Sequence, residues 1–412
     1  MNILFVHGNH PGQFRSLCGA LGESKDHKVI YLTEKDYENV DHIDGVETRS
    51  FKQHRLANST THHYLHTTEE CILKGQALIK EIDLLLADGF CPELIIFHGG
   101  MGYGLFINEL LPHAKTIGYF EWWFTSKTSQ HLCNSIDYDT RFKNDMRNLV
   151  ILKELANCTR AVVPTEWQKN QFPNLAEGKL KVIFDGVNEY FFHEDTLRHD
   201  ADSIKTILIG EELNKPLVIE NKDLIVSYAT RGMEPLRGFP EFMLLLPELF
   251  KEFNNLKVII GGRDRAAYSY TAPTENGSWK EYMLEKLKGS VDIERIFFTG
   301  LMSYENYRSL LRRSDLHVYF TRPYVVSWSL FEAITCRAHM LVNRNGATNG
   351  IATDDSVYWT DLDRLEECRE IAVNALKLPR QNRKKALLMK DYSLKKSLNE
   401  WSLLINEVFQ DH

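Results

Sequence analysis

Apolar residues along this chain form short unbroken runs that alternate with stretches of helical spacing. A short apolar run bounded by turn residues is typical of a buried strand, and such runs occur at residues 3–6, 29–32, 94–97 and 161–163. Residues 74–89 place apolar side chains three and four apart and end at a glycine, as an amphipathic helix does. Strands that alternate with helices predict an α/β fold with a parallel sheet covered on both faces.

This alternation stops at residues 188–221, which are polar, acidic and rich in turn formers, and then starts again. In the later part, residues 239–253 and 304–314 have the spacing of helices between strand-like runs. We therefore predict two doubly wound, Rossmann-like domains at 1–187 and 188–390, with 391–412 as a helix that packs back on the body. Ligands of such sheets bind beyond the carboxyl ends of the strands, so the default site is a central cleft that both domains face.

Charge and cysteine content exclude several classes of protein. The chain has 412 residues and a formal net charge of −7, which gives no general attraction to nucleic acid. Its seven cysteines are scattered without a C-x-x-C pair, which argues against a disulfide framework and fits a reducing compartment. The first residues show no signal-peptide pattern, and no apolar run approaches the roughly 18 residues of a membrane span. We expect a cytoplasmic protein.

The segment "SWSLFEA" contains Ser329 and Glu332 with the S-x-x-E spacing of a helix capping box. In that interpretation the serine caps one free backbone N–H and the glutamate reaches back to another. A helix start with hydroxyl residues is also an anion site, where a glutamate one turn further on accepts hydrogen bonds from a ribose. The pattern alone leaves both interpretations open.

Two arginines, Arg231 and Arg237, lie in "RGMEPLRGF", in a loop expected directly after a strand. Scattered surface arginines are common, but two in one post-strand loop flanked by glycines are less so. Guanidinium groups bind phosphate oxygens in a bidentate fork, so this pair can neutralise a diphosphate without a metal ion.

In the first half, candidate polar residues follow three predicted strands. "HGNHPGQF" lacks the G-x-G-x-x-G fingerprint of dinucleotide binding, although Gly12 permits close approach of a substrate. His98 ends one strand, and Glu121 ends another just before Trp122. A histidine at a strand end is usually a satisfied polar residue, whereas a carboxylate beside aromatic rings is typical of a carbohydrate site.

Two segments resemble metal sites, but each has a simpler interpretation. In "DLDRLEE", Asp363 and Glu366 suit a helix cap better than a metal-binding D-x-D. His62 and His66 have no carboxylate or cysteine ligand near them in sequence, so a loop is expected there. We predict no metal site and no cofactor.

In combination, these segments resemble a known family, the retaining GT-B glycosyltransferases of family 4, and within it bacterial members that build exopolysaccharides. The resemblance covers nearly the whole chain and is carried by "ILFVHGNHPGQFRSL", "IIFHGGMGYG", "IGYFEWWF", "VVPTEWQ", "VIFDGVN", "RGMEPLRGF" and "SDLHVYFTRPYVVSWSLFEA". It implies a GT-B fold, in which two Rossmann-like domains face a central cleft, and a nucleotide diphosphate sugar as donor.

The resemblance also implies a role for each candidate residue. Arg231 and Arg237 would hold the donor diphosphate, although the family usually pairs arginine with lysine. Ser329 and Leu330 would offer backbone amides to the phosphates, and Glu332 would bind the ribose. Gly12 would lie against donor and acceptor, with His98, Glu121 and Trp122 on the acceptor side.

One position departs from the family pattern. The family usually has a glutamate eight residues before the position of Glu332, where it touches the donor sugar, and here that residue is Tyr324. The replacement removes a carboxylate contact to the sugar and leaves the identity of the sugar open.

The sequence thus predicts retaining, metal-independent transfer of a hexose from a nucleotide sugar, UDP-linked as in UDP-glucose, in surface polysaccharide synthesis. Expected partners are that donor and a glycan or lipid-linked oligosaccharide acceptor, with no nucleic acid. Peripheral contact with the inner face of the membrane stays open. Two alternatives remain: a UDP-sugar epimerase of the same architecture, and a non-catalytic nucleotide- or glycan-binding protein.

Overall fold

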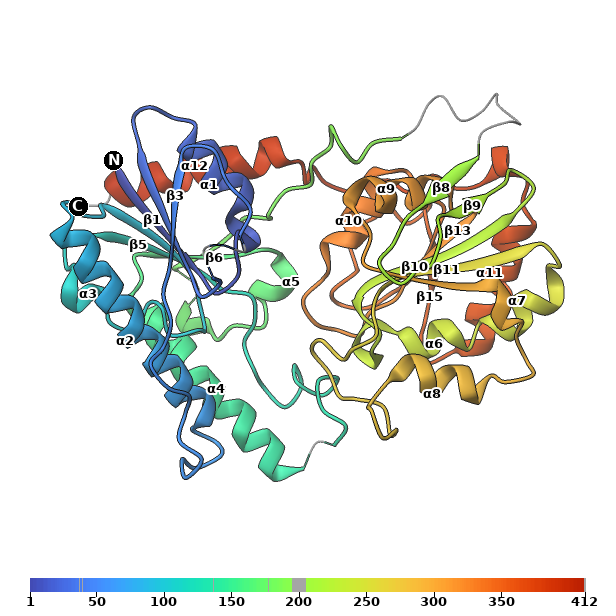
Figure 1. Ribbon diagram of the computed structural model, residues 1–412, viewed down its shortest axis with the longest axis horizontal. Coiled ribbons are helices and arrows are strands. Elements are labelled where there is room, and N and C mark those ends of the chain that lie inside the picture. Colours follow the sequence, from blue (N-terminus) through green and yellow to red (C-terminus); the bar gives the residue numbers. More distant parts are fainter. Residues whose placement is uncertain (37, 39, 136, 177, 195–204, 411–412) are drawn as a thin grey trace. The chain divides into compact units, whose positions relative to one another are not determined.

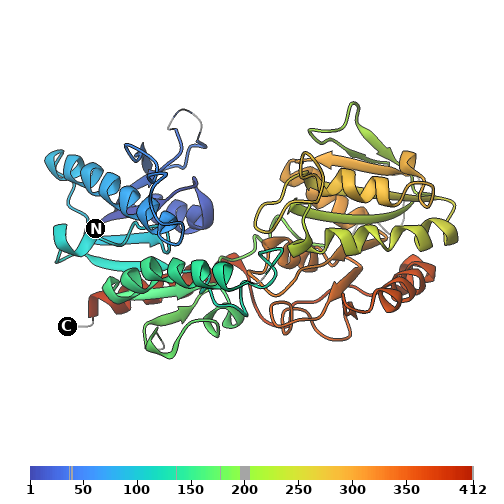
Figure 2. The same cartoon turned by 90° about the horizontal axis from the view of Figure 1, so that it is seen from below.

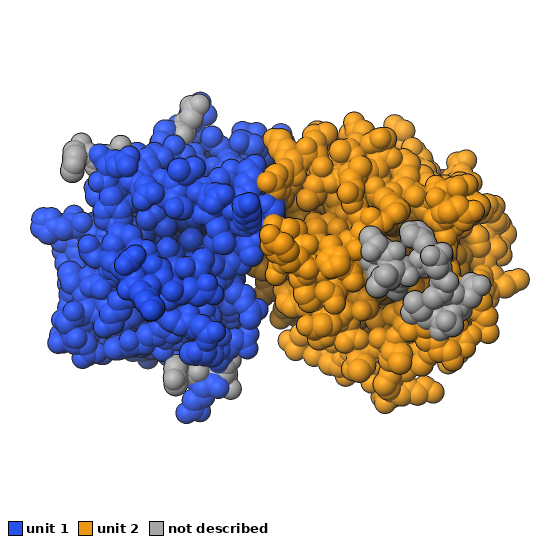
Figure 3. All heavy atoms as spheres, turned by 90° about the horizontal axis from the view of Figure 1, so that it is seen from above, with its two compact units in different colours: residues 1–130, 135–186, 393–412 blue, residues 131–134, 187–392 orange. Residues whose placement is uncertain are grey.

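The computed structural model describes residues 1–36, 38, 40–135, 137–176, 178–194 and 205–410. The chain divides into two compact units, which Figure 3 shows in different colours. Unit 1 comprises Met1–Gln130, Ser135–Gly186 and Ser393–His412, and unit 2 comprises His131–Asn134 and Val187–Tyr392. Apart from the four residues His131–Asn134, the chain therefore leaves unit 1 after Gly186 and returns to it at Ser393.

Unit 1 is built on a sheet of seven parallel strands in the order β3-β2-β1-β4-β5-β6-β7. Its strands are β1 Asn2–His7, β2 Lys28–Thr33, β3 Val46–Ser50, β4 Leu94–His98, β5 Lys115–Tyr119, β6 Arg160–Val163 and β7 Leu180–Val182. Its helices are α1 Arg15–Gly22, α2 His66–Ala87, α3 Ile107–Leu110, α4 Tyr138–Asn157, α5 Glu166–Lys169 and α12 Leu394–Gln410.

Helices cover both faces of this sheet. α1 and α12 lie on one face and α2 and α4 on the other (Figure 1), and the view from below in Figure 2 has α2 and α4 in front. Ile3 and Phe5 of β1 share a core with Trp401 and Leu404 of α12. Successive strand residues point to opposite faces, so this spacing of two directs one set toward α12.

Unit 2 repeats the design with six parallel strands in the order β12-β11-β10-β13-β14-β15, and adds an antiparallel pair, β8 and β9. Its strands are β8 Thr206–Leu208, β9 Leu217–Ile219, β10 Leu224–Gly232, β11 Leu256–Arg263, β12 Ile296–Gly300, β13 Leu316–Tyr319, β14 Met340–Asn343 and β15 Tyr358–Thr360. Its helices are α6 Phe239–Met243, α7 Leu246–Glu252, α8 Trp279–Lys286, α9 Tyr304–Arg313, α10 Trp328–Thr335 and α11 Leu365–Lys377.

The prediction of two doubly wound Rossmann-like units is confirmed, but details inside unit 2 differ. The single helix expected over 239–253 is two helices, α6 and α7, because Pro247 lies in the first turn of α7 and has no N–H to continue α6. The region 188–221, expected to be turn-rich, contains β8 and β9. Among the described helices, none combines the length and apolar character that crossing a bilayer requires.

Both large sheets reverse their strand order at one point. In unit 1 the reversal lies between β1 and β4, and in unit 2 between β10 and β13. In doubly wound sheets the loops after the two central strands diverge at such a point, and ligands bind there beyond the carboxyl ends of the strands. The residues just after these strands are therefore the candidates for function.

Candidate functional site

In unit 2 both predicted arginines lie at the carboxyl end of β10. Arg231 belongs to the strand itself, not to the loop after it as predicted, because β10 continues to Gly232 after a register shift at Ala229. Arg231 is exposed, and its Nη1 donates to the Tyr268 hydroxyl at 2.8 Å. Arg237 follows in a short 3₁₀ turn, Pro235–Arg237.

Arg237 is held more firmly than Arg231. Only 7% of Arg237 is exposed, and its Nη1 donates to Thr321 Oγ1 at 3.1 Å and to the carbonyl of Val325 at 3.0 Å. These bonds tie the end of β10 to the segment that leads from β13 into α10. The two elements on either side of the switch point in unit 2 are therefore joined through this guanidinium group.

Sequence reasoning missed two residues of this cluster in unit 2, Tyr268 and Glu234. The ring of Tyr268 lies 5.7 Å from the Arg231 guanidinium carbon and 5.4 Å from that of Arg237, distances typical of cation–π contacts. Glu234 is fully buried, and its Oε2 accepts from the backbone N–H groups of Ala267, Tyr268 and Ser269 at 2.8–2.9 Å. The only feature of the sequence that pointed to Glu234 was its position between Arg231 and Arg237.

The start of α10 corrects the capping prediction. The N-cap is Ser327, not Ser329: its side chain accepts from the backbone N–H of Ser329 at 3.2 Å. The N–H of Leu330 bonds to the carbonyl of Ser327, also at 3.2 Å. Both amides expected to bind phosphate therefore already have partners within the turn, and Ser329 Oγ lies 2.6 Å from Ser327 Oγ.

Glu332 is thus not part of a capping box, because with Ser327 as the cap it lies beyond the first turn. It is 9% exposed, and burial raises the pKa of its carboxyl from 4.5 to about 7. Within the described part of the chain its carboxylate has no hydrogen bond or ion pair. A buried carboxyl group that no cap requires is a candidate for binding a ligand.

Tyr324 lies beside the same cluster. Its ring centroid is 6.0 Å from that of Tyr268, with the planes inclined at 51°. The position that carries a glutamate in the family pattern therefore adds a second aromatic ring next to the arginines. Asp363, expected to cap the helix after "DLD", instead pairs with Arg322 at 2.9 Å, and the N-cap of α11 is Arg364 without a side-chain cap.

In unit 1, four polar side chains form a connected network at the carboxyl ends of β1, β4 and β5. His7 Nδ1 accepts the Asn9 N–H at 2.8 Å, so His7 carries its proton on Nε2 and donates to Gln13 Oε1 at 2.6 Å. Gln13 Nε2 then donates to Glu121 Oε1 at 2.9 Å. The other Glu121 oxygen lies 3.3 Å from His98 Nε2.

The pKa shifts of His7 and Glu121 indicate which groups in this network are charged at neutral pH. Burial, together with nearby His98, lowers the pKa of His7 to about 3, so His7 is a neutral donor. Burial acts to raise the pKa of Glu121, but hydrogen bonds from His98 and Gln13 outweigh it and hold the pKa below its usual value. Glu121 is therefore an ionised acceptor at neutral pH and a weak general base.

The other two predicted residues of unit 1 have different surroundings. Gly12 has φ +53°, and a Cβ there would lie 2.7 Å from His7 Nε2, so a side chain would displace the histidine. Trp122 is only 4% exposed and does not present an open ring face to a sugar. His7 and Gln13 were missed because neither spacing nor composition marks them.

Across the residues that the structure describes, no group of three or more His, Cys, Asp or Glu side chains is placed to hold a metal ion. His66, considered with His62 as a ligand pair, begins α2.

Comparisons with known proteins agree with this architecture. Residues 25–192 match the sequence model of the "Glycosyl transferase family 4 group". No curated protein matches the chain.

Solved structures match over the whole chain. Sucrose-phosphate synthase from Thermosynechococcus elongatus superposes with a TM-score of 0.70 at 12% identity, covering 100% of both chains. The catalytic domain of starch synthase IV from Arabidopsis thaliana, bound to ADP and acarbose, gives 0.61 at 11% identity and 99% of both chains. An E. coli structure described as trehalose-6-phosphate bound with UDP-2-fluoro glucose gives 0.60 at 13% identity and 100% of both chains. The chain therefore has the GT-B fold.

Proposed function

We propose that this protein is a retaining, metal-independent glycosyltransferase that moves a hexose from a UDP-linked sugar, such as UDP-glucose, to a glycan or lipid-linked acceptor. The observation that carries the proposal is the pairing of Arg231 and Arg237 at the switch point of unit 2, beside the start of α10. The family match of residues 25–192 and the GT-B fold support the reaction class. The neighbour bound with UDP-2-fluoro glucose supports a UDP-linked donor.

The donor diphosphate would bind to the two arginines. Guanidinium groups neutralise phosphate charge without a metal ion, and Arg237 is already fixed by Thr321 and Val325. Such preorganised cations stabilise charge that develops on the leaving diphosphate as the glycosidic bond breaks. Since the amides of Ser329 and Leu330 are engaged with Ser327, phosphate contact with them requires the cap to open.

Glu332 would bind the ribose. Its carboxyl group is buried without a partner in the described residues, and two ribose hydroxyls would supply the hydrogen bonds that it lacks. Hydrogen bonds to the ionised form also lower the pKa, so bound donor would hold Glu332 ionised.

Glu121 and His98 would position the acceptor. In a retaining reaction on one face of the sugar, the leaving phosphate can take the proton of the acceptor hydroxyl, so no enzyme base is required. The lowered pKa of Glu121 fits a hydrogen-bond acceptor for a sugar hydroxyl rather than a base. If the acceptor is lipid-linked, the protein would act in polysaccharide synthesis at the inner face of the membrane.

The test is a transfer assay with UDP-glucose and a panel of oligosaccharide and lipid-linked acceptors in the presence of EDTA. We expect UDP release that depends on acceptor, and a product with the anomeric configuration of the donor by NMR. An inverted product would refute retention, and activity only with added manganese or magnesium would refute metal independence.

The same assay separates the alternatives. An epimerase would convert the free donor to an isomer without acceptor, and a binding protein would take up UDP without turnover. As a matched pair, Arg231→Ala should lose transfer while Arg364→Ala, which removes an arginine 71% exposed elsewhere in unit 2, should keep it. Equal activity of both variants would refute the donor site.

A further inference from the structure

Unit 2 contains a second candidate site, at the opposite edge of its sheet from the arginines of β10. A cavity of about 200 Å³ opens where Ser314 and Asp315 precede β13 and where Ala338 and His339 precede β14. These are the amino ends of the strands, whereas Arg231 and Thr321 lie at or beyond carboxyl ends. The cavity is therefore separate from the proposed donor site of unit 2.

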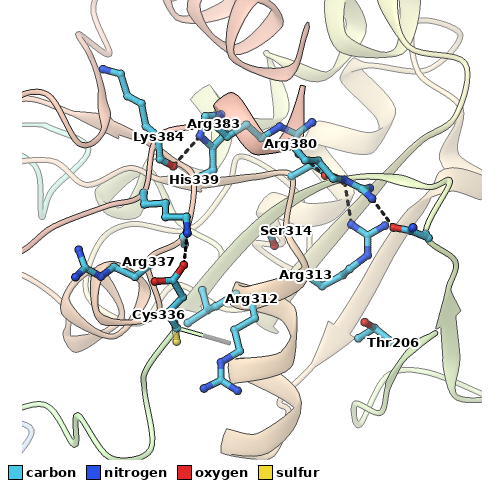
Figure 4. Close-up of a pocket in the computed structure, with 16 residues that line it drawn as sticks. Thr206, Arg312, Arg313, Ser314, Cys336, Arg337, His339, Arg380, Arg383 and Lys384 are labelled. Carbon is cyan, nitrogen blue, oxygen red and sulfur yellow. Dashed lines mark hydrogen bonds and ion pairs between the residues drawn. The ribbon is translucent and has the colours of Figure 1, made fainter. Parts of the chain in front are cut away.

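The lining of this cavity is strongly basic. Seven arginine and lysine side chains line it with only two carboxylates, Glu194 and Asp315, in a chain whose formal net charge is −7. Figure 4 shows the labelled arginines around the pocket, with Arg312 below, Arg337 on the left and Arg313 on the right. Such a local excess of positive charge favours binding of an anion.

Part of this charge has a structural explanation. Asp315 is 2% exposed and pairs with three arginines: Arg313 at 3.0 Å, Arg380 at 2.8 Å, and Arg383. The ends of helices α9 and α10 also favour cations near them. Three guanidinium groups on a single carboxylate still leave a net positive charge facing the cavity.

Two further arginines, Arg312 and Arg337, do not pair with Asp315. Arg312 Nε donates to the carbonyl of His193 at 2.8 Å, but its Nη2 is buried and has no hydrogen-bond partner in the part of the chain described. Arg337, at the end of α10, is exposed and adopts φ +56°, and among the described residues its guanidinium group has no partner. A buried N–H without a partner is costly, which a bound anion would relieve.

We propose that this cavity binds a phosphate group, held by Arg312 and Arg337. Guanidinium groups match phosphate oxygens in a bidentate fork. The volume is below the range of about 300–1,000 Å³ that holds a whole drug-sized ligand, and no Phe, Tyr or Trp lines the cavity for a base to stack on. The site therefore takes inorganic phosphate or the terminal phosphate of a larger molecule, not a nucleotide.

The inference is independent of the proposed glycosyl transfer and is tested by binding alone. Inorganic phosphate and glycerol phosphate are titrated into the full chain by calorimetry at constant ionic strength, with saturating UDP present to occupy the proposed donor site of unit 2. We expect binding that Arg312→Ala and Arg337→Ala each weaken about tenfold or more, as loss of a charge-assisted hydrogen bond implies. Arg364→Ala, an exposed arginine outside the cavity, is the matched control.

Tighter binding of glycerol phosphate would assign the site to a larger phosphorylated molecule, and tighter binding of inorganic phosphate would assign it to the free ion. No binding of either probe, or equal weakening by Arg364→Ala, overturns the proposal. Should Arg312→Ala fail to fold, Arg337→Ala decides the result, because that side chain is exposed and its loss leaves the core intact.

Discussion

Replacing Glu332 with glutamine should stabilise the protein at alkaline pH and at the same time disable it. The pKa of this carboxyl is about 7 in the folded state and 4.5 ordinarily, so between these values the folded protein holds a proton that the unfolded chain releases. The stability contributed by neutral Glu332 is therefore fully present below about pH 4.5 and is lost as the pH rises through about 7.

The size of the effect follows from the shift. A shift from 4.5 to about 7, at about 1.36 kcal/mol per pH unit, corresponds to roughly 3 kcal/mol against folding at pH 8. Glutamine carries no charge at any pH, so Glu332→Gln removes this cost. In domains of about 150–250 residues, 1 kcal/mol moves the Tm by about 2–4 °C, so we expect a rise of about 6–12 °C at pH 8 and almost none at pH 4.5.

The assay is thermal unfolding of both proteins at pH 4.5, 6 and 8, followed by transfer with UDP-glucose. Transfer should fall about ten- to a hundredfold in the variant, because glutamine has one acceptor oxygen where the carboxylate has two. A Tm difference that stays constant from pH 4.5 to 8 would refute the buried carboxyl, and full turnover by the variant would refute the ribose contact.

Three more predictions concern the same cluster of residues in unit 2. Arg231→Ala and Arg237→Ala should each weaken UDP binding about ten- to a hundredfold by calorimetry, and unchanged affinity in both variants would place the diphosphate elsewhere. Only Arg237→Ala should also lower the free energy of unfolding, by about 1–3 kcal/mol, because its bonds to Thr321 and Val325 are lost. UDP should raise the Tm without divalent metal and equally with EDTA, and a strict requirement for manganese would contradict this. Ser327→Ala should lower the free energy of unfolding by about 1 kcal/mol in urea while Ser329→Ala lowers it less, and the reverse order would restore Ser329 as the cap.

The sheets could be predicted from the sequence because parallel strands buried on both faces leave unbroken apolar runs such as 94–97. The boundary between α6 and α7 was not predicted, because the apolar spacing over 239–253 suits one helix and only Pro247 divides it. The antiparallel pair β8–β9 was missed because strands of three residues carry too little pattern to detect.

Most predicted site residues lie at or shortly after the end of a strand whose apolar run could be recognised, and Ser329, Leu330 and Glu332 lie in the first two turns of a recognisable helix. Glu234, Tyr268 and Gln13 are different, because they act through contacts between distant segments. The Glu234 carboxylate, for example, is bound by N–H groups more than thirty residues away, and no local pattern records that. The S-x-x-E motif predicted the wrong N-cap, Ser329, because Ser327, two residues earlier, caps the same helix.

The position of α12 has a consequence for how the protein is made. Its Trp401 and Leu404 complete the core against β1, yet the ribosome synthesises the main segment of unit 2, Val187–Tyr392, before it reaches α12. Unit 1 therefore cannot complete its fold until unit 2 has been synthesised. Until then, the apolar face of its sheet that α12 covers stays exposed. Expression of 1–186 alone should give an aggregation-prone fragment, whereas a fusion of 1–186 to 393–410 through a short linker should restore the missing face.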